Sequence, residues 1–287
     1  MESMDEQMNQ CPVCESTRFI KRKKFKELEL GDCSECGLGY ATPLVEGEQA
    51  VSHAKSTITS SEYYTNIKQE FEAQSKLAAV KAEKMLTYYR AINPAREISS
   101  ILEIGCGTGA YCSAFESLGV SWRGLEVNPE MVEFANRHDV PVEAINIMEE
   151  SIEGHYDIVF LSQVLEHVID PVSFLQRIKS SMSAHSILHL DVPNHDALIS
   201  VIRKYNPFSR DYGFLQPYHH LVAYNKAALQ GLLLKAGFEM LEIDAYANDH
   251  PVMGQLLTKT RVAHTVLMRA SDVLKRGSLL VAVVKIS

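Results

Sequence analysis

A glycine-rich turn and two acidic residues form the part of this 287-residue chain that is most informative about chemistry. Glu103 lies in a short apolar run and is followed by glycines at alternate positions, Gly105, Gly107 and Gly109. Glycine lets the backbone approach a ligand closely, and the N–H groups at the start of a following helix point at that ligand. Glu126 follows Gly124 and Leu125 at the end of a second expected strand, where an acid can accept hydrogen bonds from both hydroxyls of a ribose. This combination predicts a nucleoside-binding turn between a strand and a helix.

The spacing of these residues argues against a dinucleotide as the ligand. A dinucleotide-binding turn reads Gly-x-Gly-x-x-Gly and places a pyrophosphate at the helix N-terminus. Here the turn reads Glu-x-Gly-x-Gly-x-Gly. The carboxylate of Glu103 would repel a pyrophosphate, but it suits a cationic ligand that carries a sulfonium and an ammonium group.

At this point the chain resembles the class I S-adenosylmethionine (SAM)-dependent methyltransferases. Residues 102–109 are similar to their first motif and residues 124–129 to their second. Further similar segments are the fourth strand with its following turn, the fifth strand, the segment before the last large helix and the end of that helix, at residues 156–171, 187–194, 218–221 and 236–238. The resemblance covers residues 96–287 and implies an α/β fold, doubly wound and Rossmann-like, around a seven-stranded, mostly parallel sheet.

The resemblance also implies which residues bind SAM, at the carboxyl ends of the strands. Glu103 would face the positive end of the cofactor and Glu126 its ribose. Asn146 lies near the place where the family often has an Asp for the adenine amino group, so a side-chain contact from Asn146 is a guess. The complete predicted set is Glu103, Gly105, Cys106, Gly107, Gly109, Glu126, Val127, Asn146, Ser162, Gln163 and Tyr64.

Three histidines are candidate catalytic residues. His220 occupies the position of the histidine in a Glu-His-Leu motif of the resembling families, and His219 replaces the glutamate. An imidazole with an ordinary pKa near ~6.5 can remove a proton at cellular pH. The alternative is that His220 orients a lid over the site. His167 belongs to a Glu-His-Val element common across the family, for which a structural role is the favoured interpretation.

Four of the six cysteines form two Cys-x-x-Cys pairs, Cys11 with Cys14 and Cys33 with Cys36. This spacing is typical of a zinc ribbon that presents four thiolates to one tetrahedral Zn²⁺ ion. A site with four cysteine ligands has no open position, so we expect the zinc to be structural. A redox site or a vestigial site is the alternative. The residues that follow the second pair resemble the joint between ribbon and catalytic domain in bacterial small-molecule methyltransferases, including sugar C-methyltransferases.

These features predict a zinc ribbon over residues 1–40, a linker and a helix that packs over the cofactor site over 41–95, and a methyltransferase domain over 96–287. The pre-core helix is expected near 61–92. Strands are expected near 99–104, 121–126, 141–145, 156–161, 185–191, 238–245 and 278–286, the last two forming a reversed hairpin at the sheet edge.

Two insertions exceed what the core requires. Residues 195–217 are expected to form a lid, in which Arg203, Arg210 and Tyr212 are candidate substrate-binding residues for a carboxylate or phosphate. Residues 248–276 are expected to contain an amphipathic helix for packing or for formation of a homodimer.

The net charge and the distribution of apolar residues limit the kinds of partner that this chain can have. The net charge of −8 argues against a nucleic-acid substrate. No stretch approaches the ~18 apolar residues that would cross a bilayer, so we expect a soluble cytoplasmic enzyme acting on a small, anionic metabolite.

Two other functions are possible from the sequence. One is an RNA methyltransferase that uses the ribbon for docking, favoured by the basic run at 21–26. The other is a non-catalytic SAM-binding protein. Against RNA, the first 40 residues hold six Lys and Arg but eight Asp and Glu.

Overall fold

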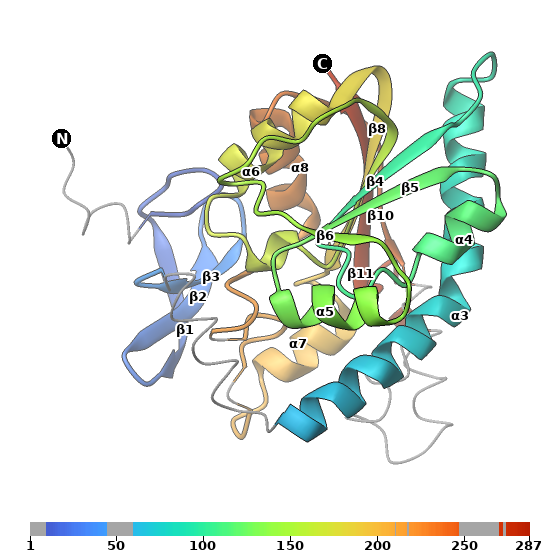
Figure 1. Cartoon of the computed structure of the whole chain (residues 1–287). Helices are drawn as coiled ribbons and strands as arrows, with labels where there is room; N and C mark the ends of the chain where they lie inside the picture. The colour runs from blue at the N-terminus through green and yellow to red at the C-terminus, as the bar shows by residue number, and fades with distance from the viewer. Residues whose placement is uncertain (1–9, 45–59, 210, 217, 247–269, 272–273) are drawn as a thin grey trace.

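A computed structural model describes residues 10–44, 60–209, 211–216, 218–246, 270–271 and 274–287 (Figure 1). Its centre is one large sheet. The strands of that sheet are β4 (Ser100–Ile104), β5 (Ser121–Glu126), β6 (Val142–Ala144), β7 (Tyr156–Ser162), β8 (Met182–Pro193), β10 (Phe238–Tyr246) and β11 (Leu279–Ile286). Their order across the sheet is β10-β11-β8-β7-β4-β5-β6.

The sheet is mostly parallel, as the sequence predicts. Neighbouring strands from β8 through β7, β4 and β5 to β6 run parallel. Only β11 is reversed, and it pairs antiparallel with β8 on one side and with β10 on the other. The order changes direction at β4, so the carboxyl ends of β4 and β7 diverge there, which is where ligands bind in open α/β sheets.

Helices cover both faces of this sheet (Figure 1). One face packs against α3 (Ser60–Ile92), α4 (Cys112–Ser117) and α5 (Pro129–Arg137), and the other against α6 (Pro171–Ile178) and α8 (Lys226–Lys235). Successive strand residues point to opposite faces, so Ile101 joins one buried cluster and Leu102 the other. Because both faces are buried at the centre of the sheet, the central strands β4 and β7 contain short apolar runs.

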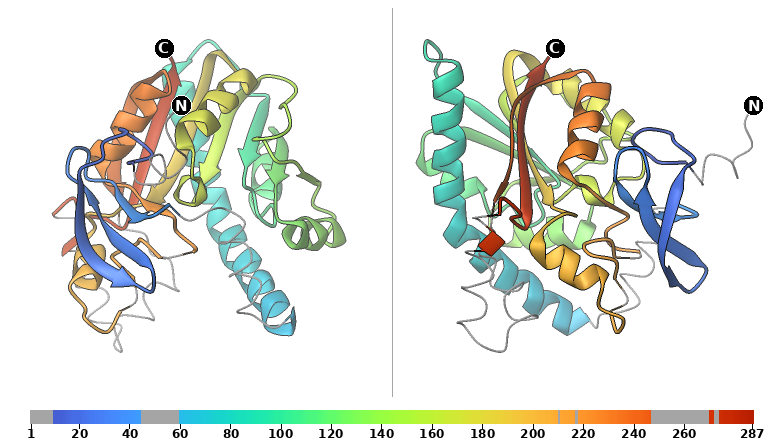
Figure 2. Two further views of the ribbon diagram at one scale, coloured as in Figure 1. Left: turned by 90° about the vertical axis from the view of Figure 1, so that its left-hand side faces the viewer. Right: turned by 180° about the vertical axis from the view of Figure 1, so that it is seen from behind.

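The N-terminal segment forms a second, antiparallel sheet. It consists of β1 (Phe19–Phe25), β2 (Leu28–Cys33) and β3 (Gly39–Thr42), and it is completed by β9 (Val222–Ala223), which comes from the methyltransferase part of the chain. Leu38 and Tyr40 of this segment belong to the same buried cluster as Leu229 of α8, and Figure 2 shows the ribbon beside that helix. The hydrophobic core therefore continues across residue 40, where the sequence places a domain boundary.

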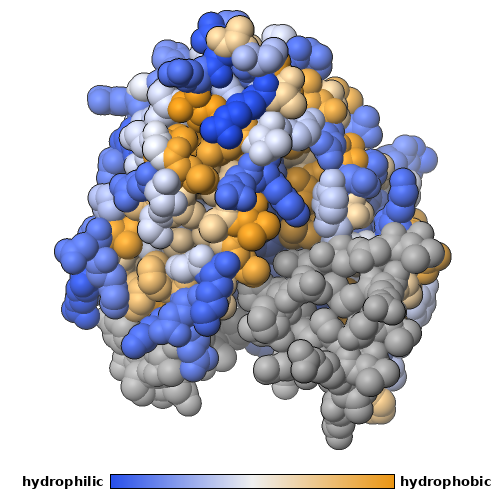
Figure 3. All heavy atoms as spheres, turned by 90° about the vertical axis from the view of Figure 1, so that its right-hand side faces the viewer, coloured by the Kyte–Doolittle hydropathy of each residue, from blue (hydrophilic) through white to orange (hydrophobic). Residues whose placement is uncertain are grey.

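The two predicted insertions are described to different extents. In the expected lid, α7 (Leu198–Lys204) is followed by an irregular segment, and Arg210 lies outside the described residues. Most of the expected helix at 248–276 also lies outside them. Within the described chain, no helix combines the length and the apolar character needed to cross a membrane. On the face shown in Figure 3, hydrophobic areas are interrupted by hydrophilic side chains.

Candidate cofactor site and histidine cluster

The glycine turn follows β4, and at one of its three glycines no protein atom lies close to the position that a side chain would take. Gly105, Gly107 and Gly109 have φ angles of 68°, 55° and 69°, in the left-handed region that favours glycine. A Cβ added at Gly105 would come within 2.6 Å of Val164, so packing alone requires glycine there. A Cβ added at Gly107 would meet no heavy atom within 4 Å. Gly107 is therefore the position at which a ligand can approach the backbone.

Glu126 holds this turn against the end of β5. Its Oε2 accepts a hydrogen bond from the backbone N–H of Gly107 at 2.8 Å. Its Oε1 accepts from the N–H groups of Val127 and Asn128, each at 2.8 Å. A carboxylate has about four acceptor positions, so about one remains for a ligand. The predicted contact with ribose stays a prediction, and Glu126 has a structural role in addition.

Glu103 is a buried acid in the same region. It is 3% exposed, and its Oε2 accepts a hydrogen bond from Nε1 of Trp122 at 2.8 Å. Burial raises the pKa of Glu103 to about 8, although the bond from Trp122 and the charge of Lys81 oppose the rise. The carboxyl group is therefore mainly protonated at neutral pH in the free protein, and a cation placed beside it would favour its ionised form.

A buried carboxylate that the sequence analysis did not single out organises the end of β7. Asp191, 2% exposed, accepts hydrogen bonds from Oγ of Ser162 at 3.1 Å and from Nε2 of Gln163 at 3.0 Å. Nζ of Lys81, on α3, lies 3.5 Å from the same carboxylate. Burial alone would lower the pKa of Lys81, but the interactions with Asp191 and Tyr111 together outweigh burial, and the pKa is raised. In the sequence, only the position of Asp191 near the end of a predicted strand indicates a role at this site. Nothing in the sequence marks Lys81.

The remaining predicted cofactor residues have different surroundings. Asn146 closes its own turn, since its side chain donates to Glu149 at 2.9 Å and accepts from the N–H of Met148 at 3.1 Å. Val127 is 65% exposed. Cys106 is buried, and burial raises the pKa of its thiol. Tyr64 lies in α3, but its side chain is outside the described residues.

The structure brings the three predicted catalytic histidines together. The centroids of the His167, His219 and His220 rings lie 4.7 to 5.0 Å apart. Nδ1 of His167 donates to the carbonyl of His219 at 2.7 Å, and Nδ1 of His220 donates to the carbonyl of Phe214 at 3.0 Å. Burial and the neighbouring imidazoles lower the pKa of His220 to about 3. The rings are neutral at cellular pH, and His220 is a much weaker base than the sequence analysis expects.

The four ribbon cysteines also converge. Sγ of Cys11 lies 3.6 Å from that of Cys36, and Sγ of Cys14 lies 3.5 Å from that of Cys33. All four sulfurs lie within 4.8 Å of one another. Zn–S bonds of ~2.3 Å in tetrahedral geometry separate the sulfurs by about 3.8 Å, so the residues present fit a Zn²⁺ ion.

The two candidate substrate-binding residues of the lid that the structure describes, Arg203 and Tyr212, contact other residues of the protein. Tyr212 is 6% exposed, and its hydroxyl donates to the carboxylate of Asp32 in the ribbon at 2.6 Å. The guanidinium of Arg203 lies over the ring of Phe214, 5.7 Å from its centre. In this arrangement Tyr212 joins lid to ribbon rather than presenting its hydroxyl to a ligand.

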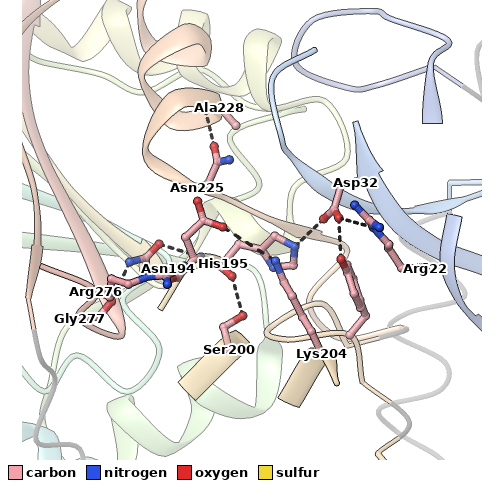
Figure 4. Close-up of polar contacts among 12 residues, drawn as sticks. Arg22, Asp32, Asn194, His195, Ser200, Lys204, Asn225, Ala228, Arg276 and Gly277 are labelled. Atoms are coloured by element: carbon pink, nitrogen blue, oxygen red, sulfur yellow. Dashed lines mark hydrogen bonds and ion pairs between the residues drawn. The ribbon is translucent and has the colours of Figure 1, made fainter. Parts of the chain in front are cut away.

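Asp32 is the centre of a polar network that connects the ribbon with the segment after β8 (Figure 4). Nε2 of His195 donates to Oδ1 of Asp32 at 3.0 Å, and Nε of Arg22 donates to Oδ2 at 3.2 Å. The hydroxyl of Ser200 donates to the carbonyl of His195 at 2.7 Å. No motif in the sequence marks Asp32 or His195.

Comparison with known proteins identifies the family. The sequence profile of a methyltransferase domain matches residues 69–243, more than half of the chain. The chain belongs to this methyltransferase family. The match begins within α3 and ends within β10, so it includes the glycine turn, Glu126, Asp191 and all three clustered histidines.

Relatives and solved structures are similar to this methyltransferase chain over different lengths. The ubiquinone biosynthesis O-methyltransferase of Xanthomonas campestris pv. campestris (strain B100) is 27% identical over 114 residues, 37% of this chain and 48% of that protein. The enzyme of the same name from Rhodopseudomonas palustris (strain TIE-1) is 32% identical over 94 residues, 31% of this chain and 37% of that protein. The chain therefore spans less than half the length of these curated relatives.

Two solved structures show the same fold at low identity. A SAM-dependent methyltransferase from Archaeoglobus fulgidus has a TM-score of 0.55 and 19% identity, with 78% of this chain and 99% of that one covered. The plantazolicin methyltransferase solved in complex with SAH has a TM-score of 0.57 and 16% identity, with 84% of this chain and 95% of that one covered.

Proposed function

We propose that this protein transfers the methyl group of SAM to a small-molecule acceptor. The observation that carries the proposal is the open space in front of Gly107, bordered by the turn that Glu126 fixes and placed at the carboxyl ends of β4 and β5. A nucleoside ligand fits such a turn. Membership of the methyltransferase family and the ubiquinone biosynthesis O-methyltransferases among the relatives support the reaction class.

The roles of the residues follow from their surroundings. When bound, SAM supplies an activated methyl group on a sulfonium. The N–H groups of the glycine turn and the remaining acceptor position of Glu126 would hold the nucleoside. Glu103 would favour the positive end of the ligand once ionised. Asp191 holds Ser162 and Gln163 at the end of β7, where we expect them to border the path of the methyl group.

We assign no general base in this proposal. The lowered pKa of His220 leaves it a weak acceptor for a proton, and efficient bases have a pKa near the working pH. The catalytic roles predicted for His220, His219 and His167 stay predictions. The same holds for the substrate contacts of Arg203, Arg210 and Tyr212 and for an anionic acceptor.

We also propose that Cys11, Cys14, Cys33 and Cys36 bind a structural Zn²⁺ ion. Four thiolates leave no position for a substrate. The ion would hold the residues on either side of β1 and β2 together in a segment too small to fold by its hydrophobic contacts alone.

The structure weakens the support for an RNA substrate. In the basic run at 21–26, Lys21 pairs with Glu29 and Arg22 with Asp32, while Lys23 donates to the carbonyls of Asn206 and Asp211. Cations that are paired within the protein contribute less to phosphate binding. We therefore propose a small molecule rather than RNA as the acceptor.

Calorimetry with SAM, with NAD as the control ligand, tests cofactor binding. We expect SAM to bind and NAD not to bind. Incubation with isotopically labelled SAM and a metabolite extract, followed by mass spectrometry, tests turnover. A labelled small molecule supports the proposal. SAM binding without a labelled product would favour a non-catalytic SAM-binding protein, and absence of SAM binding would overturn the proposal.

A further inference from the structure

We infer that His167, His219 and His220 form a second metal site, separate from the four cysteines, that binds a divalent ion such as Zn²⁺ through three imidazole nitrogens. The histidines come from two segments, the turn after β7 and the segment before β9. This site would stand whether or not the protein transfers methyl groups.

The distances between the rings fit one shared ion after small movements. One ring nitrogen of each histidine lies within 4.8 Å of one ring nitrogen of each of the other two. Zn–N bonds of ~2.0–2.1 Å in a tetrahedral site place the nitrogens about 3.3 Å apart. His167 and His219 are exposed, so their rings can move inward without disturbing the core.

The hydrogen bonds of His167 and His220 leave one ring nitrogen of each, Nε2, free to bind an ion. Nδ1 of His167 and Nδ1 of His220 each donate to a backbone carbonyl, so the lone pair of each neutral ring is on Nε2. Metal-binding histidines almost always donate their other N–H to a carbonyl, carboxylate or water, which fixes both tautomer and orientation. Here the carbonyls of His219 and Phe214 accept these hydrogen bonds.

The backbone holds the two segments at a fixed separation. The N–H of Leu221, next to His220, donates to the carbonyl of Glu166, next to His167, at 2.8 Å. The N–H of His219 donates to the carbonyl of Gln216 at 3.0 Å, which closes a turn before the two adjacent histidines. The backbone of the two segments is therefore already held in place before an ion binds.

The donor set predicts the kind of ion and its open position. Imidazole nitrogens suit Zn²⁺, Cu²⁺, Ni²⁺ and Fe²⁺ more than Mg²⁺ or Ca²⁺. Three protein ligands leave a fourth position of a tetrahedral ion for water or for an oxygen of a bound molecule. The ribbon site differs in its donor atoms, which are thiolates, and in having no open position, because all four ligands come from the protein.

Cobalt(II) can separate the two sites in the full-length protein. Thiolate ligands give Co²⁺ intense charge-transfer absorption, whereas imidazole ligands do not. We expect the wild-type protein to bind two Co²⁺ ions per chain, of which only one shows thiolate charge transfer. The variants His167→Ala, His219→Ala and His220→Ala should weaken the second ion by at least ~10-fold and leave the thiolate signal unchanged.

His185→Ala is the matched control, since His185 is exposed and lies outside the cluster. We expect it to bind both ions as the wild type does. The thiolate signal and a thermal melt report whether each variant is folded. If an alanine variant does not fold, the glutamine variant at the same position (for example His219→Gln), which keeps more of the side-chain volume, is used in its place. The inference is overturned if the wild-type protein binds only the thiolate-ligated ion, or if all three variants retain the second ion with unchanged affinity.

Discussion

Nε2 of His195 lies 3.0 Å from a carboxylate oxygen of Asp32, so a buried imidazole in the methyltransferase part contacts strand β2 of the ribbon. His195 is 1% exposed. Tyr212 and Arg22 donate to the other oxygen of the same carboxylate. Of these three donors, His195 and Tyr212 come from outside the ribbon, so their bonds to Asp32 hold the ribbon against the methyltransferase part of the chain (Figure 4).

The first prediction concerns this carboxylate. Asp32→Asn keeps the volume of the side chain but removes the charge and one acceptor oxygen, so the donors to that oxygen lose their partner. We expect the free energy of unfolding to fall by about 1–3 kcal/mol, measured by urea denaturation with the zinc content checked in parallel. Glu35→Gln is the control, because the exposed pair of Glu35 with Arg18 should contribute less than about 1 kcal/mol. Equal effects of the two substitutions would contradict the role of Asp32.

The second prediction concerns Gly107. Gly107→Ala would place a methyl group in the open space proposed for the cofactor. Gly119→Ala is closely matched, since Gly119 also has a positive φ, of 77°, and also has no heavy atom within 4 Å of an added Cβ. Both variants should lose about 1–2 kcal/mol of stability through backbone strain. Only Gly107→Ala should weaken SAM binding in calorimetry, by ~10-fold or more, which is about 1.4 kcal/mol. Similar SAM affinities for the two variants would place the cofactor elsewhere.

The third prediction concerns proton release by Glu103. In the free protein the pKa of Glu103 is raised to about 8, so the group is protonated at pH 7. A cation that binds beside it lowers this pKa and expels the proton. SAM affinity should therefore increase as pH rises toward 8, by at most about tenfold per pH unit, and then level off. Calorimetry at pH 7 in buffers of different ionisation enthalpy should detect the released proton.

The variant Glu103→Gln cannot release this proton, so its SAM affinity should be nearly independent of pH between 6 and 8. Glu116→Gln, which changes an exposed acid on α4, should retain the behaviour of the wild type. A wild-type affinity that does not change over this range would show that Glu103 does not face the positive end of the ligand.

The fourth prediction concerns the pair of Lys81 and Asp191. Lys81→Met removes the cation but leaves the buried carboxylate with only neutral donors. Because Lys81 is about one-third exposed, at 36% for its side chain, the loss of stability should be smaller than for a fully buried pair, about 1–2 kcal/mol. Lys84→Met, on the exposed side of the same helix, should change stability by less than about 0.5 kcal/mol.

A second substitution separates charge from packing at this pair. If the cost arises from the uncompensated charge, adding Asp191→Asn to Lys81→Met should destabilise the protein by less than the sum of the two single effects. Strict additivity in chemical denaturation would show that the two side chains do not interact.

The sequence by itself determined the features that depend on neighbouring residues. The turn from Glu103 to Gly109 and the paired cysteines are short-range patterns, and their backbone requirements can be recognised without a structure. The alternation of strand-like segments and helical periods likewise predicted every strand of the large sheet to within a few residues. Burial on both faces leaves the clearest apolar runs in the central strands β4 and β7.

Only the tertiary structure decided which distant side chains meet. Asp191 and Lys81, Asp32 and His195, and His167 with His219 and His220 each lie on segments that are far apart in the sequence. The addition of β9 to the ribbon sheet likewise depends on how the two parts pack. Such contacts leave no periodic pattern, because each requires only one polar residue whose partner is set by packing of the chain in three dimensions.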